Sequence, residues 1–138
     1  MSKPAIAFSR LVVVGALVLS GASAAWAATV QLTGTEEVPA LTTTASGNGS
    51  ITVAEDHTVT GTITTTGIQG TAAHIHMAAA GQNGPVIVPL KKDGDTYSVP
   101  EGSKLTDQQY EAYKAGNTYV NVHSAAHPGG EIRAQLKP

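Results

Sequence analysis

The chain has no cysteine and only one phenylalanine and one tryptophan among its 138 residues. The absence of cysteine excludes a disulfide framework, a thiolate metal site, a blue-copper site, a lipid anchor on cysteine and a cysteine nucleophile. Phe8 and Trp26 both lie in the first 27 residues, so four tyrosines are the sole aromatic residues of the remainder. We therefore expect a core of Val, Ile, Leu, Ala and Thr, which together favour β-strands.

Residues 1 to 27 are typical of a secretory signal peptide. Basic residues precede an apolar stretch over Leu11–Leu19, and the sequence AWA at residues 25 to 27 is an A-x-A cleavage pattern. An uncleaved anchor helix is the alternative, but a membrane span needs about 20 apolar residues, more than this stretch provides. We expect a periplasmic or secreted protein of 111 residues, 28 to 138, with no membrane contact after cleavage.

The chain is acidic once the predicted signal peptide is removed. Six Lys and Arg then stand against ten Asp and Glu, which gives a net charge of −4 with neutral histidine. A basic surface for binding nucleic acid is excluded by this balance. No nucleic-acid partner is therefore expected.

Short segments of alternating apolar and polar residues predict an all-β domain. The clearest of them is TVTGTITTTG at residues 58 to 67. Turn-forming residues separate these segments at spacings that favour an antiparallel sandwich or barrel over β-α-β units. The other predicted strands are Thr29–Thr33, Gly49–Val53, Ala73–His76, Val86–Leu90, Tyr119–His123 and Ile132–Leu136.

One short helix is predicted near residues 106 to 115. Thr106 is suited to the N-cap position, and Gln109 follows it at the spacing of a capping box. Gly116 is suited to end the helix. We expect the helix to cover an open end of the sandwich.

Histidine is the residue type whose placement is most informative. His74 and His76 alternate on a predicted strand, which puts both rings on one face of the sheet, and His123 ends another strand. Three imidazoles from neighbouring strands could hold one copper or zinc ion, because nitrogen donors suit these metals whereas calcium prefers oxygen. Two polar residues on a solvated sheet face are the alternative interpretation of the H-x-H pair.

Two further histidines lie outside the predicted strands. His127 follows His123 by four residues, in a loop bounded by the Pro-Gly-Gly sequence at residues 128 to 130. It is a candidate fourth metal ligand, and the alternatives are a supporting role beside the ligands or simple exposure. His57 lies beside two acidic residues in an apparent hairpin turn, and we interpret it as a surface residue.

Three sequence blocks resemble the CHRD domain family. They are LTGTEEVPALTTTASGNGSITV at Leu32–Val53, GTAAHIHMAAAGQNGPVIVPL at Gly70–Leu90 and GNTYVNVHSAAHPGGEIRAQL at Gly116–Leu136. The resemblance covers essentially all of residues 28 to 138. The family occurs in animal chordin and as free-standing exported bacterial proteins, and membership implies little about function.

A more distant resemblance is to the Cu,Zn superoxide dismutases. Residues 49 to 77 are similar to the part of that family where two strands lead into an H-x-H pair that binds copper, and VNVH resembles the later strand that supplies another ligand. The resemblance implies a superoxide dismutase-like fold, a Greek-key antiparallel β-sandwich or barrel. It also implies copper ligation by His74, His76 and His123.

Arg133 follows a glycine-rich turn, where the dismutases place an arginine beside copper. The resemblance implies that Arg133 is catalytic and draws in a small anion such as superoxide, with a salt bridge to Glu131 or Glu111 as the alternative. No histidine lies between His76 and His123, so the bridging histidine and the zinc site of those enzymes have no counterpart. A single copper ion is therefore expected in preference to zinc.

Three functions are compatible with these observations. The first is a copper-dependent superoxide dismutase, and the second is a periplasmic copper buffer or carrier that uses the same histidines without turnover. The third is a metal-free extracellular interaction module, by analogy with chordin. The first two differ in solvent access and reduction potential, which the sequence does not reveal, whereas the third predicts histidines that do not converge.

Overall fold

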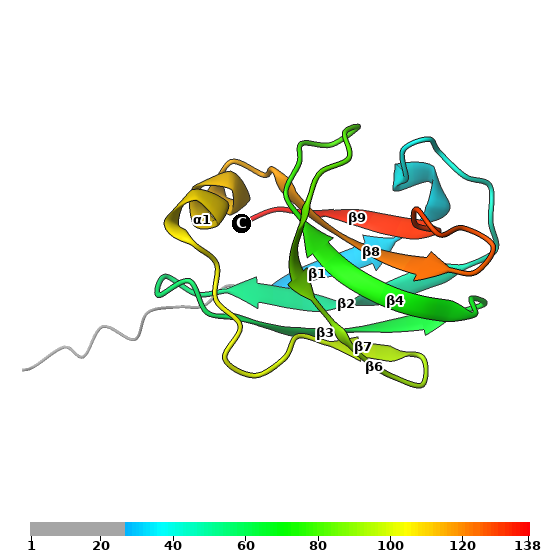
Figure 1. Cartoon of the computed structure of the whole chain (residues 1–138), viewed down its shortest axis with the longest axis horizontal. Helices are drawn as coiled ribbons and strands as arrows, with labels where there is room; N and C mark the ends of the chain where they lie inside the picture. Colours follow the sequence, from blue (N-terminus) through cyan, green and yellow to red (C-terminus); the bar gives the residue numbers. More distant parts are fainter. Residues whose placement is uncertain (1–26) are drawn as a thin grey trace, which may run out of the picture.

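The computed structural model describes residues 27 to 138, which form two antiparallel β-sheets and one α-helix (Figure 1). The predicted signal peptide lies outside the described residues, except for Ala27. The prediction of an antiparallel, nearly all-β domain with one short helix is confirmed. No helix among the described residues is long and apolar enough to cross a membrane.

The larger sheet has five strands in the order β1-β2-β3-β7-β6. Its strands are β1 (Ala27–Leu32), β2 (Ser46–Val53), β3 (Val59–Thr66), β7 (Thr96–Ser98) and β6 (Lys91–Asp93). The hairpin of β6 and β7 was not among the predicted strands, because strands of three residues are too short to show an alternating pattern. Strand β2 begins earlier than predicted, since Gly47 and Gly49 interrupt the pattern without interrupting the pairing with β3.

The smaller sheet has four strands in the order β5-β4-β8-β9. Its strands are β5 (Val86–Pro89), β4 (Gly70–His76), β8 (Thr118–Ser124) and β9 (Ile132–Leu136). Neighbours in this sheet are antiparallel throughout. All four strands match predicted segments to within a few residues at each end.

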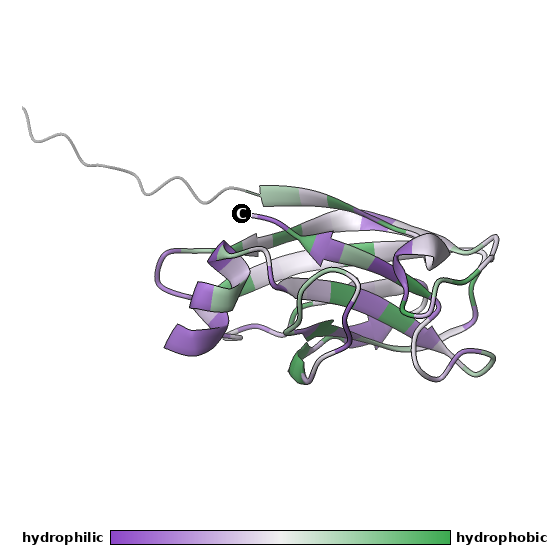
Figure 2. Cartoon of the chain, turned by 90° about the horizontal axis from the view of Figure 1, so that it is seen from above, coloured by the Kyte–Doolittle hydropathy of each residue, from purple (hydrophilic) through white to green (hydrophobic). Residues whose placement is uncertain are grey.

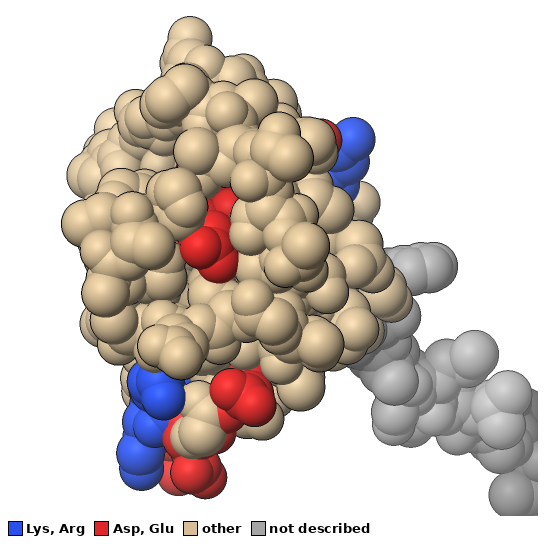
Figure 3. Space-filling model, turned by 90° about the vertical axis from the view of Figure 1, so that its right-hand side faces the viewer, with Lys and Arg blue, Asp and Glu red and all other residues tan. Residues whose placement is uncertain are grey.

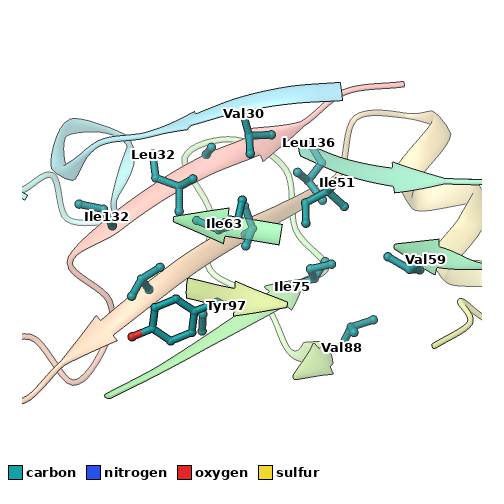
Figure 4. Close-up of a cluster of buried hydrophobic side chains, with 14 of the residues drawn as sticks. Val30, Leu32, Ile51, Val59, Ile63, Ile75, Val88, Tyr97, Ile132 and Leu136 are labelled. Carbon is teal, nitrogen blue, oxygen red and sulfur yellow. The ribbon is translucent and has the colours of Figure 1, made fainter. Parts of the chain in front are cut away.

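The core lies between the two sheets (Figure 4). Aliphatic side chains alternate inward along the strands, as the sequence predicts, and Figure 2 shows hydrophobic and hydrophilic residues alternating along them. Tyr97 is the large aromatic residue at the centre and is 1% exposed. The other members include Val30, Leu32, Ile51, Ile63, Ile75, Val120, Val122, Ile132 and Leu136.

The predicted helix is confirmed as α1 (Asp107–Lys114), which covers one end of the sandwich (Figure 1). Thr106 and Gln109 form the predicted capping box, because each side chain bonds the backbone N–H of the other. Gly116 follows the helix with a φ of 77°, a left-handed conformation that glycine adopts without strain. The helix is largely hydrophilic (Figure 2) and buries Tyr113 against the core.

The chain crosses from the larger sheet to the outer face of the smaller one directly after β1. Thr33 and Arg133 exchange backbone hydrogen bonds of 3.1 and 2.9 Å, which join β1 to β9. A 3-10 helix, η1 (Gly34–Glu36), follows and lies against β9. In Figure 1, η1 and the β4–β5 loop both lie above the smaller sheet, on the side away from the larger sheet. These two segments therefore cover part of this outer face.

Candidate metal centre

Three predicted metal ligands meet on the outer face of the smaller sheet. His74 and His76 alternate along β4, and His123 lies on the neighbouring strand β8. Because His123 pairs with Ala72 across the two antiparallel strands, its side chain points to the same face as the β4 rings. One ring nitrogen from each histidine lies within 4.8 Å of the other two. The structure thus brings these three side chains together.

Backbone carbonyls set the orientation of two of the rings. His76 Nδ1 lies 2.9 Å from the carbonyl oxygen of Gly84, and His123 Nδ1 lies 2.9 Å from that of Pro128. A carbonyl only accepts hydrogen bonds, so Nδ1 carries the proton in both rings and Nε2 keeps a free lone pair. Metal-binding histidines are supported in the same way, with the nitrogen that does not bind the ion donating to a fixed acceptor.

His74 completes the nitrogen cluster. Its Nδ1 lies 3.0 Å from Nε2 of His123, and its ring centroid lies 5.6 Å from that of His76. Two nitrogens about 3 Å apart can both reach one ion at the metal–nitrogen distance of about 2.0 to 2.1 Å. The spacing therefore suits either a hydrogen bond between the two rings or joint ligation of one ion.

Two buried acceptor atoms beside the rings have no hydrogen-bond partner within residues 27 to 138. They are His76 Nε2 and Asn121 Oδ1, and their residues are 8% and 2% exposed. Burial of such atoms without a donor is costly. Both atoms offer an electron pair, so a bound cation would satisfy them. The donor set therefore fits a metal ion.

Burial lowers the pKa of two of the three histidines. For His74, desolvation is the largest cause, followed by the nearby rings of His123 and His76. For His76, desolvation again dominates, and the hydrogen bond to the Gly84 carbonyl offsets part of it. A lowered pKa keeps both rings neutral at neutral pH, and the neutral ring is the form that binds metal.

The metal-free protein is expected to lose stability as the pH falls below 6.5, the ordinary pKa of histidine. The unfolded chain takes up protons there, whereas native His74 and His76 resist protonation until lower pH. The contribution of these residues to the free energy of unfolding is thus full above pH 6.5 and declines toward their native pKa values. Urea unfolding at about pH 7.5 and about pH 5.5 measures the decline.

His76→Gln is the matched variant for this test, because glutamine does not titrate and the decline should shrink. Burial raises the pKa of Glu37, which acts with the opposite sign, but Glu37 is present in both proteins. An equal decline in the two proteins would show that His76 is not its source.

Arg133 holds the loop over residues 77 to 85 against the centre. Arg133 is 1% exposed. Its Nη2 donates to the carbonyl oxygens of Ala79 and Gln82 at 3.3 and 2.8 Å. Its Nη1 donates to Asn83 Oδ1 at 3.2 Å. One guanidinium group therefore holds three residues of the loop by charge-assisted hydrogen bonds.

Tyr119 connects Arg133 with the histidines. The Arg133 guanidinium carbon lies 3.4 Å from the Tyr119 ring centroid. The His76 ring stacks on the same tyrosine, with centroids 4.7 Å apart and planes inclined by 3°. The His76 ring and the Arg133 guanidinium group cannot both stack on the same face of the Tyr119 ring. They therefore lie on its two opposite faces. A fixed positive charge thus lies one aromatic ring away from His76.

The placement of Arg133 differs from the alternative considered from the sequence. Within residues 27 to 138 it forms no salt bridge with Glu131 or Glu111, and its hydrogen bonds go to neutral acceptors. Burial explains the difference, because Arg133 lies in the covered layer on the outer face rather than at an exposed strand edge. Its implied role in guiding an anion stays a prediction.

His127 does not join the cluster of ligand nitrogens. Its Nε2 lies 3.6 Å from Glu131 Oε1, and its side chain is 37% exposed. With Glu37 and Asn83 it lines a hollow at the end of the sandwich opposite α1, where Figure 3 shows acidic atoms set among uncharged side chains. Of the roles considered for His127, a position beside the ligands or plain exposure fits this placement.

His57 lies in the turn between β2 and β3, as predicted, but it is more than a surface residue. Its ring stacks on Tyr110 of α1 with centroids 4.2 Å apart, and its Nδ1 lies 3.5 Å from Asp107. His57 therefore attaches the helix to the end of the sandwich, away from the three clustered histidines.

Several residues of the centre were not predicted from the sequence. The alternation that places His123 on the outer face also places Tyr119 and Asn121 there, so the signal for them was present in β8. Gly84 allows a close approach, because a Cβ at this position would lie 1.9 Å from a backbone oxygen. Glu37 reaches the centre from a distant segment, and no local pattern indicates it.

Comparison with known protein families matches residues 28 to 136 to the CHRD domain. Comparison with curated proteins and with solved structures found no match. The matched range includes both sheets, the three clustered histidines and the loops that cover them. The chain belongs to the CHRD domain family.

Proposed function

We propose that the chain is an exported copper-binding protein that holds one copper ion with His74, His76 and His123. The convergence of one nitrogen from each ring within 4.8 Å carries this proposal. Copper binds nitrogen donors more tightly than the other common divalent ions, including zinc. A metal-free interaction module is less favoured, because it predicts histidines that do not converge. An exported location is proposed from the sequence of residues 1 to 27 alone.

We propose superoxide dismutation as the activity of the copper-bound protein. Bound copper would supply one-electron oxidation and reduction. His74 and His123 are only half-buried, so a small anion could approach the ion from their side. The guanidinium of Arg133 contributes a fixed positive charge behind Tyr119, and such local charge attracts anions even in an acidic protein.

A copper buffer or carrier is the second candidate. One observation favours it: both terminal nitrogens of Arg133 already donate to acceptors in the protein. An arginine engaged in this way has less capacity to bind an incoming anion. The two candidates share the same ligands and differ in turnover.

A Greek-key arrangement of the superoxide dismutase type is the finer fold that we propose. Strands distant in the sequence are neighbours in both sheets, since β3 pairs with β7 and β4 pairs with β8. Such pairings are expected of Greek-key sandwiches.

Copper loading tests the proposed site. The metal-free protein is expected to bind one equivalent of Cu(II) with an electron paramagnetic resonance spectrum of nitrogen ligation. His74→Ala and His123→Ala should each weaken binding by about 100-fold or more, because each removes a ligand. His57→Ala, which removes a histidine at the other end of the sandwich, should bind as the wild type does. Unchanged spectra and stoichiometry in both ligand variants would contradict the assignment.

Superoxide turnover separates the enzyme from the carrier. The copper-loaded wild type is compared with an equal amount of copper bound adventitiously to the His74→Ala variant. An enzyme should remove superoxide much faster than this control. Equal rates, together with tight binding by the wild type, would favour the carrier.

A further inference from the structure

Asn121 lies at the centre of the outer face of the smaller sheet. It pairs with His74 of β4 on one side and with Arg133 of β9 on the other. His123 follows it by two residues on β8, so both side chains point to the same face. The three histidines and Asn121 therefore lie next to one another on one face of two neighbouring strands.

The side-chain oxygen of Asn121 is buried and has no donor. The residue is 2% exposed, and Oδ1 has no hydrogen-bond partner in the described part of the chain. Its side chain lies close enough to His76 to influence the pKa of that ring, yet Nε2 of His76 is also unpartnered. Two buried electron-pair donors on the same face of the sheet thus have no hydrogen-bond donor, an arrangement that a bound cation stabilises.

Glu37 determines which way the Asn121 amide is turned. Glu37 is 5% exposed and directly follows η1. Burial raises the pKa of Glu37, and the Asn121 amide beside it offsets part of that effect. The amide turns its NH₂ group to the side of Glu37, since Nδ2 and Glu37 Oε1 both lie against Gly130, and Glu37 Oε1 has no hydrogen-bond partner among the described residues. The oxygen is the end of the amide that points away from Glu37.

Gly130 allows this pair to form. A Cβ on Gly130 would lie 2.5 Å from both Asn121 Nδ2 and Glu37 Oε1, so any side chain would occupy the space where the two groups meet. Gly130 also has a φ of 122°, which disfavours residues with side chains. The glycine-rich turn before β9 thus makes room for the Glu37–Asn121 pair.

We propose that Asn121 supplies a fourth, oxygen ligand to the ion held by the three histidines, and that Glu37 is the positioning residue that directs this oxygen. The inference rests on the proposed copper site and adds a donor to it. A set of three nitrogens and one oxygen suits the tetragonal geometry of Cu(II), whereas Cu(I) prefers softer donors. Asn121 should therefore stabilise Cu(II) more than Cu(I).

Removal of the oxygen tests the proposal. Asn121→Leu keeps the approximate volume of the side chain and should weaken Cu(II) binding by about 10- to 100-fold, while Cu(I) binding changes by less than about threefold. Competition titrations with chelators specific for each oxidation state measure both affinities.

The positioning role of Glu37 has its own variants. Glu37→Gln keeps an acceptor for the Asn121 amide and should retain Cu(II) affinity to within a few-fold. Glu37→Leu removes the acceptor and should weaken Cu(II) binding and alter the resonance spectrum. Asn48→Leu is the matched control, because Asn48 is exposed on β2 of the other sheet.

A measurement on the wild type keeps the proposal testable if Asn121→Leu fails to fold. Asparagine labelled with ¹³C at the side-chain carbonyl should give an electron–nuclear coupling to bound Cu(II), since this carbon would be two bonds from the ion. If the wild type binds copper through its histidines without this coupling, the assignment of Asn121 as a ligand is wrong, whereas the proposed copper site is supported. If the wild type binds no copper, the proposed function itself fails.

Discussion

Arg133→Met is expected to lower the free energy of unfolding by about 3 kcal/mol, because it removes several hydrogen bonds of a charged group that are each worth about 1.5 to 3 kcal/mol. Methionine can fill the space beside Tyr119, but it cannot donate to the carbonyl oxygens of Ala79 and Gln82. The Gln82 oxygen would lose its arginine donor, whereas the Ala79 oxygen would keep only the Gln82 N–H. Native domains of this kind are stable by only about 5 to 15 kcal/mol, so the variant would be close to unfolding. Urea or thermal unfolding of the metal-free protein measures the loss.

Arg133→Lys is the control for charge alone. Lysine keeps the positive charge, but its single ammonium group cannot reproduce the hydrogen bonds of two guanidinium nitrogens or the flat stacking on Tyr119. We expect an intermediate loss of stability. If Arg133→Met unfolds within about 1 kcal/mol of the wild type, the loop over residues 77 to 85 is held by other contacts.

Copper is expected to raise the melting temperature by about 15 °C when free copper is about a thousandfold above its dissociation constant. An ion that binds only the native state adds about 4 kcal/mol under these conditions, because the added stability grows with the logarithm of the ion concentration. The effect requires preferential binding to the native state, which ligands assembled before the ion arrives favour. The hydrogen bonds of His76 to Gly84 and of His123 to Pro128 supply that assembly. Differential scanning calorimetry with and without Cu(II) measures the shift.

The double variant His74→Ala, His123→Ala controls for copper that binds elsewhere. It should show a shift of at most a few degrees, as should the wild type in the presence of excess chelator. A large shift in the double variant would place the stabilising ion at another site. No shift in the wild type would contradict selective binding of copper by the native state.

The fold was predictable where alternation and turns are regular. Strand β3 follows TVTGTITTTG closely, and the capping box of Thr106 and Gln109 marks the start of α1. Prediction failed at the β6–β7 hairpin, whose short strands are stabilised by pairing with β3 rather than by their own sequence. Propensity and periodicity are local signals, and tertiary pairing overrides them in short segments.

The candidate site was predictable only in part. The alternation of His74 and His76 was enough to predict that these two rings share one face, whereas the position of His123 beside them depends on the pairing of β4 with β8. The covering layer was not predictable, because it depends on how the segments after β1 and β4 fold back over the sheet. These covering segments bury Arg133 and bring Glu37 close to Asn121.

The acceptors that orient His76 and His123 are peptide carbonyls, at Gly84 and Pro128, rather than side chains. No point substitution can delete a peptide oxygen, so the protonation pattern of the two rings is robust to mutation at either acceptor as long as the loop keeps its course. Altering the length of a loop, by contrast, would displace the oxygen and release the ring. Exchange of a whole loop would therefore change the orientation of a ring without substitution of any ligand.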